Sequence, residues 1–107
     1  MIAVTFTDRG RNLSLTVKGH AGYAEPGNDI VCASASILAY TLASIVDSFD
    51  DVESVIDIGD GDMTIECECK DADTFLEVKN AYMYSLVGYA LLEQNYPQYV
   101  SLYSDLT

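Results

Sequence analysis

Residues 18–34 of the chain are KGHAGYAEPGNDIVCAS, and they separate a predicted strand from a predicted helix. The stretch contains His20, the only histidine of the protein, and Cys32, one of only three cysteines. Three glycines accompany them: Gly19, Gly22 and Gly27. Glycine reaches backbone conformations that other residues avoid, so we expect a sharply turning loop that lets a peptide backbone come close.

The sequence on both sides of this loop predicts alternating hairpins and helices. Alternating β-branched segments predict strands, and apolar residues at spacings of three and four predict helices. The predicted strands are 2–7, 13–19, 52–59, 62–69 and 99–104, and the predicted helices are 30–49 and 71–95. The order ββαββα plus a short final strand predicts an α+β fold. We expect one domain, residues 1–107, with two helices packed against antiparallel hairpin sheets.

The same spacings predict which side of each helix is buried. In the first helix the predicted stripe is Val31, Ala35, Leu38, Leu42, Ile45 and Phe49. In the second helix it is Phe75, Val78, Tyr82, Leu86 and Tyr89.

Composition limits the function. Half of the 107 residues are hydrophobic, and 17 acidic against 5 basic residues give a net charge of −12. A nucleic-acid-binding protein needs a basic face, so we expect no direct contact with nucleic acid and favour a cationic partner or simple solubility. No signal peptide is evident, and no apolar run approaches the length of a membrane span, so we expect an intracellular protein with reduced thiols and no membrane contact.

The spacing of Asp29 and Cys32 predicts a chemically useful helix start. If Asp29 is the N-cap, Cys32 is the third helical residue and donates its backbone N–H to the Asp29 carboxylate. The helix dipole then favours the thiolate, which is the nucleophilic form of cysteine. The alternative is that Cys32 is a small core residue, as many free cysteines are.

His20 follows a predicted strand and faces the loop that leads to Cys32. A hairpin packed on the helix could bring the imidazole to the helix start, where it would act as general base and then as general acid. The alternative is an ordinary surface histidine. Ser36 lies four residues after Cys32 and therefore on the same helix face, where it could support a site or simply pack.

Cys67 and Cys69 alternate with glutamates on a predicted strand and share one of its faces. They could bind a metal, form a redox pair, or be ordinary strand residues. A zinc site needs about four ligands, and no second cysteine or histidine pair lies at a suitable spacing. We therefore expect no metal and no cofactor.

The stretch GHAGYAEPGNDIVCASASIL, residues 19–38, resembles the signature of the ribosomal-processing cysteine proteases, the Prp family. The match consists of two blocks, residues 19–24 and the run from Gly27 to Ala33, and the end of the second helix with YPQYV is also similar. In length and element order the resemblance covers nearly the whole chain.

This resemblance implies a small cytoplasmic endopeptidase, homodimeric, of Firmicutes and related bacteria. Its expected partner is the N-terminal extension of a basic large-subunit ribosomal protein, number twenty-seven, which it removes. The resemblance assigns the role of nucleophile to Cys32 and of general base to His20, with Asp29 and Ser36 in supporting positions. It also implies a substrate loop that includes Gly19, Gly22, Tyr23 and Gly27.

Two other functions stay open at this point. One is a non-catalytic acidic module that chaperones a basic ribosomal protein, with His20 and Cys32 structural. The other is a thiol redox protein that uses Cys67 and Cys69.

Overall fold

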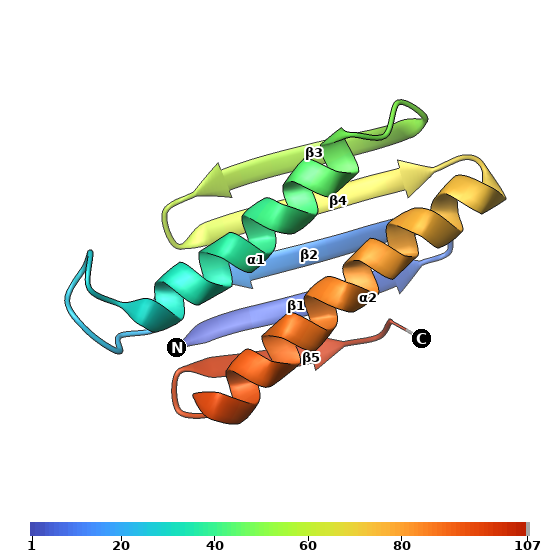
Figure 1. Cartoon of the computed structure of the whole chain (residues 1–107). Coiled ribbons are helices and arrows are strands. Elements are labelled where there is room, and N and C mark those ends of the chain that lie inside the picture. Colours follow the sequence, from blue (N-terminus) through green and yellow to red (C-terminus); the bar gives the residue numbers. More distant parts are fainter. Residues whose placement is uncertain (107) are drawn as a thin grey trace.

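The computed structural model, which describes residues 1–106, has two helices on one face of a five-stranded sheet (Figure 1). The elements in chain order are β1 (Ile2–Arg9), β2 (Asn12–Lys18), α1 (Ile30–Asp47), β3 (Val52–Gly59), β4 (Asp62–Cys69), α2 (Ala72–Asn95) and β5 (Val100–Ser104). The predicted α+β class and element order are confirmed. Thr107, the last residue of the predicted domain, lies outside the described residues.

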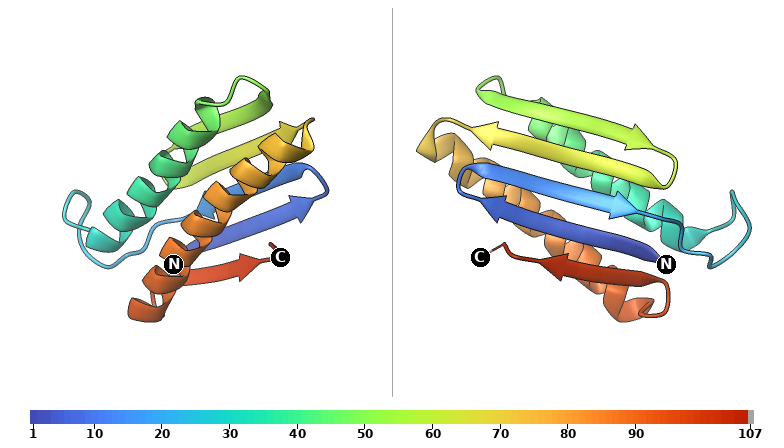
Figure 2. Two further views of the ribbon diagram at one scale, coloured as in Figure 1. Left: turned by 45° about the vertical axis from the view of Figure 1, so that its right-hand side comes forward. Right: turned by 180° about the vertical axis from the view of Figure 1, so that it is seen from behind.

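The two predicted hairpins form a single sheet in the order β3-β4-β2-β1-β5. β2 and β4 pair antiparallel, whereas β5 pairs parallel with β1, so the sheet is mixed rather than wholly antiparallel. The register pairs Lys18 with Asp62, which brings the β3–β4 turn beside the end of β2. The second face of the sheet carries no helix (Figure 2).

The core lies between the sheet and the two helices. Alternate strand residues point into it, including Val4, Phe6, Leu13, Leu15 and Ile65, each at most 1% exposed. Two buried tyrosines of α2 complete the layer by donating hydroxyl hydrogen bonds: Tyr82 to the Ile65 carbonyl at 2.9 Å and Tyr89 to the Ala35 carbonyl at 2.7 Å. The Tyr89 bond ties α2 to α1 one turn beyond Cys32.

The buried stripe of α1 differs from its prediction at the C-terminal half. Ala39, Ala43 and Val46 are buried there, whereas Ile45 is 38% exposed. Small side chains let the helix approach the sheet and α2 closely, and this advantage outweighs the greater hydrophobicity of Ile45. In α2, Val78, Tyr82 and Tyr89 are buried as predicted, while Phe75 and Leu86 are only partly buried.

The expectation that no apolar run is long enough for a membrane span is wrong for α1. By length and composition alone, Ile30–Asp47 could cross a bilayer, with a mean hydropathy of 1.7 over 18 residues. Its buried side chains pack against the sheet and α2, so the core accounts for the apolar character of that side of the helix.

Candidate active site

The start of α1 has the predicted capped geometry. Asp29 is the N-cap with extended backbone, φ −88° and ψ 101°. Its Oδ1 accepts the backbone N–H of Val31 at 3.0 Å and of Cys32 at 2.9 Å. Cys32 therefore lies in the first turn, where unpaired N–H groups and the helix dipole favour a thiolate over a thiol.

The second oxygen of Asp29 holds the preceding loop. Oδ2 accepts the backbone N–H of Tyr23 at 3.0 Å and of Ala24 at 3.4 Å. One carboxylate thus joins the loop to the helix start. Burial acts to raise the pKa of Asp29, but the hydrogen bonds from Cys32, Ala24 and Tyr23 outweigh it and hold this pKa below its ordinary value.

The loop between β2 and α1 turns at glycines and is fastened at one aromatic side chain. Gly22 and Gly27 have φ of +70° and +89°, which other residues rarely adopt. The ring of Tyr23 packs edge-on against Tyr96 at 5.6 Å and Tyr99 at 5.2 Å between centroids. The loop beyond Tyr23 projects from the body of the protein (Figure 1).

The Cys32 thiol is half-buried and has a polar partner. The backbone N–H of Ala21 points at Cys32 Sγ at 3.3 Å. A donor at this distance stabilises a thiolate more than a thiol. The loop therefore contributes directly to the electrostatics of the sulfur.

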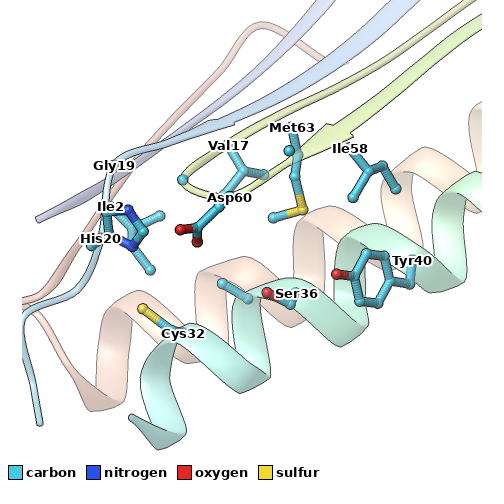
Figure 3. Close-up of a pocket in the computed structure, with 13 residues that line it drawn as sticks. Ile2, Val17, Gly19, His20, Cys32, Ser36, Tyr40, Ile58, Asp60 and Met63 are labelled. Carbon is cyan, nitrogen blue, oxygen red and sulfur yellow. The ribbon is translucent and has the colours of Figure 1, made fainter. Parts of the chain in front are cut away.

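His20 follows β2, and its ring lies against the β3–β4 turn. The Gly19 N–H donates to the Gly61 carbonyl at 2.8 Å, which fastens the end of β2 to that turn. A Cβ at Gly61 would lie 2.5 Å from His20 Nε2, so the imidazole occupies the space that only glycine leaves free. Figure 3 shows the ring on the same side of the sheet as Cys32, above the start of α1.

Two adjoining hollows meet at this point. A cleft of about 290 Å³ extends toward the apolar side chains of Tyr40, Ile58 and Met63. A second hollow, of about 600 Å³, extends beneath the glycine-rich loop. Both are lined by the same four polar residues: His20, Cys32, Ser36 and Asp60. We call the two hollows together the groove; the imidazole and the thiol lie at its middle.

The structure brings most of the predicted site residues to the groove. His20, Cys32, Ser36 and Asp29 line it, as do Gly19, Gly22 and Gly27, whereas Tyr23 points instead to the aromatic corner of Tyr96 and Tyr99. Sequence reasoning missed Asp60 and Gly61, together with the apolar end of the groove. The segment GDGD signalled only a hairpin turn, and nothing local shows that this turn faces His20.

Cys67 and Cys69 lie away from the groove. Both are buried on the inner face of β4, 3% and 1% exposed. Burial raises the pKa of Cys67, and burial with the neighbouring thiol raises the pKa of Cys69 to about 11. Such thiols are poor nucleophiles at neutral pH, which disfavours the redox interpretation. Within residues 1–106, no three His, Cys, Asp or Glu side chains gather as a metal site would require.

Comparison with known proteins gives matches that span the chain. The family model named cysteine protease Prp matches residues 1–101. A ribosomal processing protease Prp from S. aureus, solved with a covalently linked product peptide, has a TM-score of 0.82 and 25% identity, covering 98% of this chain and 100% of that one. The same protease solved with a substrate peptide gives a TM-score of 0.75 at 23% identity, covering 98% and 100%.

A third solved structure, SMU.848 from Streptococcus mutans, has 30% identity and a TM-score of 0.69, covering 97% of this chain and 93% of that one. No match was found among the curated proteins.

Proposed function

The chain belongs to the Prp family of cysteine proteases, and on that premise we propose that it removes the N-terminal extension of bacterial large-subunit ribosomal protein number twenty-seven, with Cys32 as nucleophile and His20 as general base. The observation that carries the proposal is that His20 and Cys32 line both hollows of the same groove. Membership of a protease family also favours catalysis over the alternative of a non-catalytic acidic module.

The reaction needs one proton to move between two side chains. His20 takes the proton from Cys32 Sγ, and the thiolate attacks the carbonyl carbon of the scissile bond. The tetrahedral intermediate collapses as the C–N bond breaks, and the imidazolium gives its proton to the leaving amine. Water then attacks the thioester, His20 accepts a proton from that water, and the departing sulfur takes the proton back.

The arrangement around the sulfur supports this chemistry. The first turn of α1 and the Ala21 N–H both favour negative charge on Cys32 Sγ. The backbone N–H of Cys32 is already bonded to Asp29, so another donor must stabilise the oxyanion of the intermediate. Within residues 1–106 the Ser36 hydroxyl has no hydrogen-bond partner, whereas Ser34 bonds back to the Ile30 carbonyl at 2.7 Å. We assign that supporting role to Ser36.

The groove and the charge of the chain suit an extended, basic substrate. The two hollows open on either side of the catalytic pair, so residues on both sides of a scissile bond have a place to bind. The net charge of −12 complements a ribosomal protein, which is basic, and speeds encounter between the two. The S. aureus relatives, solved with substrate and product peptides, agree with peptide binding in this fold.

Homodimer formation and a cytoplasmic location are further parts of the proposal. The outer side of the two helices carries exposed apolar residues, including Ile37, Tyr84, Val87 and Leu91, each more than half exposed. A second copy would bury this surface, which a monomer leaves in water. Light scattering should show a dimer, and Leu91→Glu should shift it toward monomer; a monomeric wild type would contradict this part.

The substrate is tested by incubating the protein with the extended ribosomal protein and measuring intact mass. We expect a single product that has lost the N-terminal extension, and no change when the extension sequence is scrambled. Cleavage elsewhere in the ribosomal protein, or equal cleavage of the scrambled extension, would contradict the assignment of substrate.

A further inference from the structure

The side chain of Asp60 enters the groove from the β3–β4 turn. Figure 3 shows its carboxylate pointing toward the His20 ring, with Cys32 across the groove on α1. Asp60 lines both hollows, as do His20 and Cys32. The Asp60 side chain is exposed, so packing in the core does not explain why it points toward His20.

The turn that carries Asp60 is fastened to the end of β2, just before His20. The Gly19 N–H donates to the Gly61 carbonyl at 2.8 Å, and the backbones of β2 and β4 pair in register as far as Lys18 and Asp62. The imidazole itself rests on Gly61. Asp60 and His20 are therefore held by neighbouring anchor points, and their separation does not depend on the conformation of residues 21–28.

The other ionisable groups near His20 either bond to backbone atoms or lie across the groove on α1. Asp29, which lines the adjoining hollow, accepts four backbone N–H groups with its two oxygens. The amino group of Met1 donates to the His20 carbonyl at 2.7 Å rather than to the ring. From α1 the only ionisable side chain at the junction of the hollows is the Cys32 thiol. Asp60 thus supplies the carboxylate at this junction that has no hydrogen-bond or ion-pair partner among residues 1–106.

We propose that Asp60 is the positioning residue for His20, an inference that rests on the proposed function. It touches no reacting atom and acts only through the imidazole. When His20 takes the proton from Cys32 Sγ, the nearby carboxylate stabilises the imidazolium and holds the ring toward the sulfur. Within residues 1–106 of the free chain the ring has no hydrogen bond, so it is free to donate a ring N–H to Asp60 in the substrate complex.

The chain offers two spectroscopic and chemical reporters for this proposal. His20 is the only histidine, so its Cε1–H resonance is a unique proton NMR signal. Cys32 is the one thiol that is not buried, so alkylation by iodoacetamide reports on it selectively. Neither measurement requires a substrate. Asp60→Asn is the test variant. Asp62→Asn is the matched control, because it removes the same charge two residues away, at the start of β4 and outside the groove, and loses only an exposed ion pair with Lys18.

We expect Asp60→Asn to change the pH dependence of the His20 Cε1–H resonance, because the imidazolium loses a nearby counter-charge. Asp62→Asn should change it much less. The pH profile of Cys32 alkylation should change in Asp60→Asn alone. With substrate, kcat should fall roughly 10- to 100-fold at nearly constant KM, and Asp60→Glu, which keeps the carboxylate, should recover part of the loss.

Equal titration midpoints and equal alkylation profiles in Asp60→Asn and Asp62→Asn would overturn the proposal, and so would an undiminished kcat in Asp60→Asn. If wild-type protein fails to cut the ribosomal substrate but the two variants still differ in the His20 titration, the substrate assignment fails while the role of Asp60 toward His20 stands.

Discussion

Replacing Gly61 by alanine should disable the enzyme while leaving it folded. The new Cβ would lie 2.5 Å from His20 Nε2, 3.0 Å from Cε1 and 3.1 Å from Cδ2. Ordinary contact requires roughly 3.5 Å, so the imidazole must retreat by about 1 Å. A misplacement of about 1 Å can cost roughly 100-fold in rate. The backbone at φ +68° adds about 1–2 kcal/mol of strain for any residue with a Cβ.

Gly10→Ala is the matched control for this prediction. Gly10 lies in the β1–β2 turn with φ +71°, and a Cβ there would meet nothing within 4 Å. Both variants should lose similar stability in chemical denaturation, but only Gly61→Ala should lose cleavage of the extended ribosomal protein. Similar rates in the two variants would refute the reasoning, because the position of the imidazole would then not matter.

The remaining predictions concern the loop and the helix start. Asp29→Ala should cost about 0.5–2 kcal/mol of stability and slow cleavage. The control is Asp71→Ala, which removes the cap of α2 and should destabilise the protein without slowing cleavage. Equal cleavage rates in these two variants would contradict the role of Asp29. Folding lowers the pKa of Asp29, so the ionised carboxylate stabilises the folded protein. This stabilisation is complete above the unfolded pKa of about 3.9 and is lost as the pH falls through the folded pKa. The denaturation midpoints of wild type and Asp29→Ala should therefore converge in acid. If the loop of residues 21–28 closes over the substrate, its amide hydrogens should exchange more slowly once an uncleavable peptide binds, and faster in Tyr23→Ala than in wild type; strong protection that the peptide does not change would exclude such closure. Gly27→Val, at φ +89°, should slow cleavage, which a rate assay would check.

Local sequence patterns predicted much of the fold. Alternation and helical spacing predicted every strand and helix, and β3 (Val52–Gly59) and β4 (Asp62–Cys69) have the predicted bounds. The N-cap at Asp29 was predictable for the same reason, because a cap and its N–H partner lie three residues apart. These features depend on a few neighbouring residues, which a single sequence displays.

Non-local features could not be predicted in this way. Strand order is decided by packing between distant segments, so neither the parallel pairing of β5 with β1 nor the contact of β2 with β4 was visible. Asp60 and Gly61 reach His20 only through that contact. Burial of Ala43 instead of Ile45 has the same cause, since the helix contacts the sheet where small residues permit close approach.

The central claim is that Cys32 is the nucleophile, and cleavage by Cys32→Ala tests it most directly. Wild-type protein and the variant would each be incubated with the extended ribosomal protein, and products followed by intact mass. Cys67→Ser serves as the control, because that thiol is buried away from the groove. We expect Cys32→Ala to fold and leave the substrate intact while Cys67→Ser trims it. Trimming by Cys32→Ala at the wild-type rate would contradict the account.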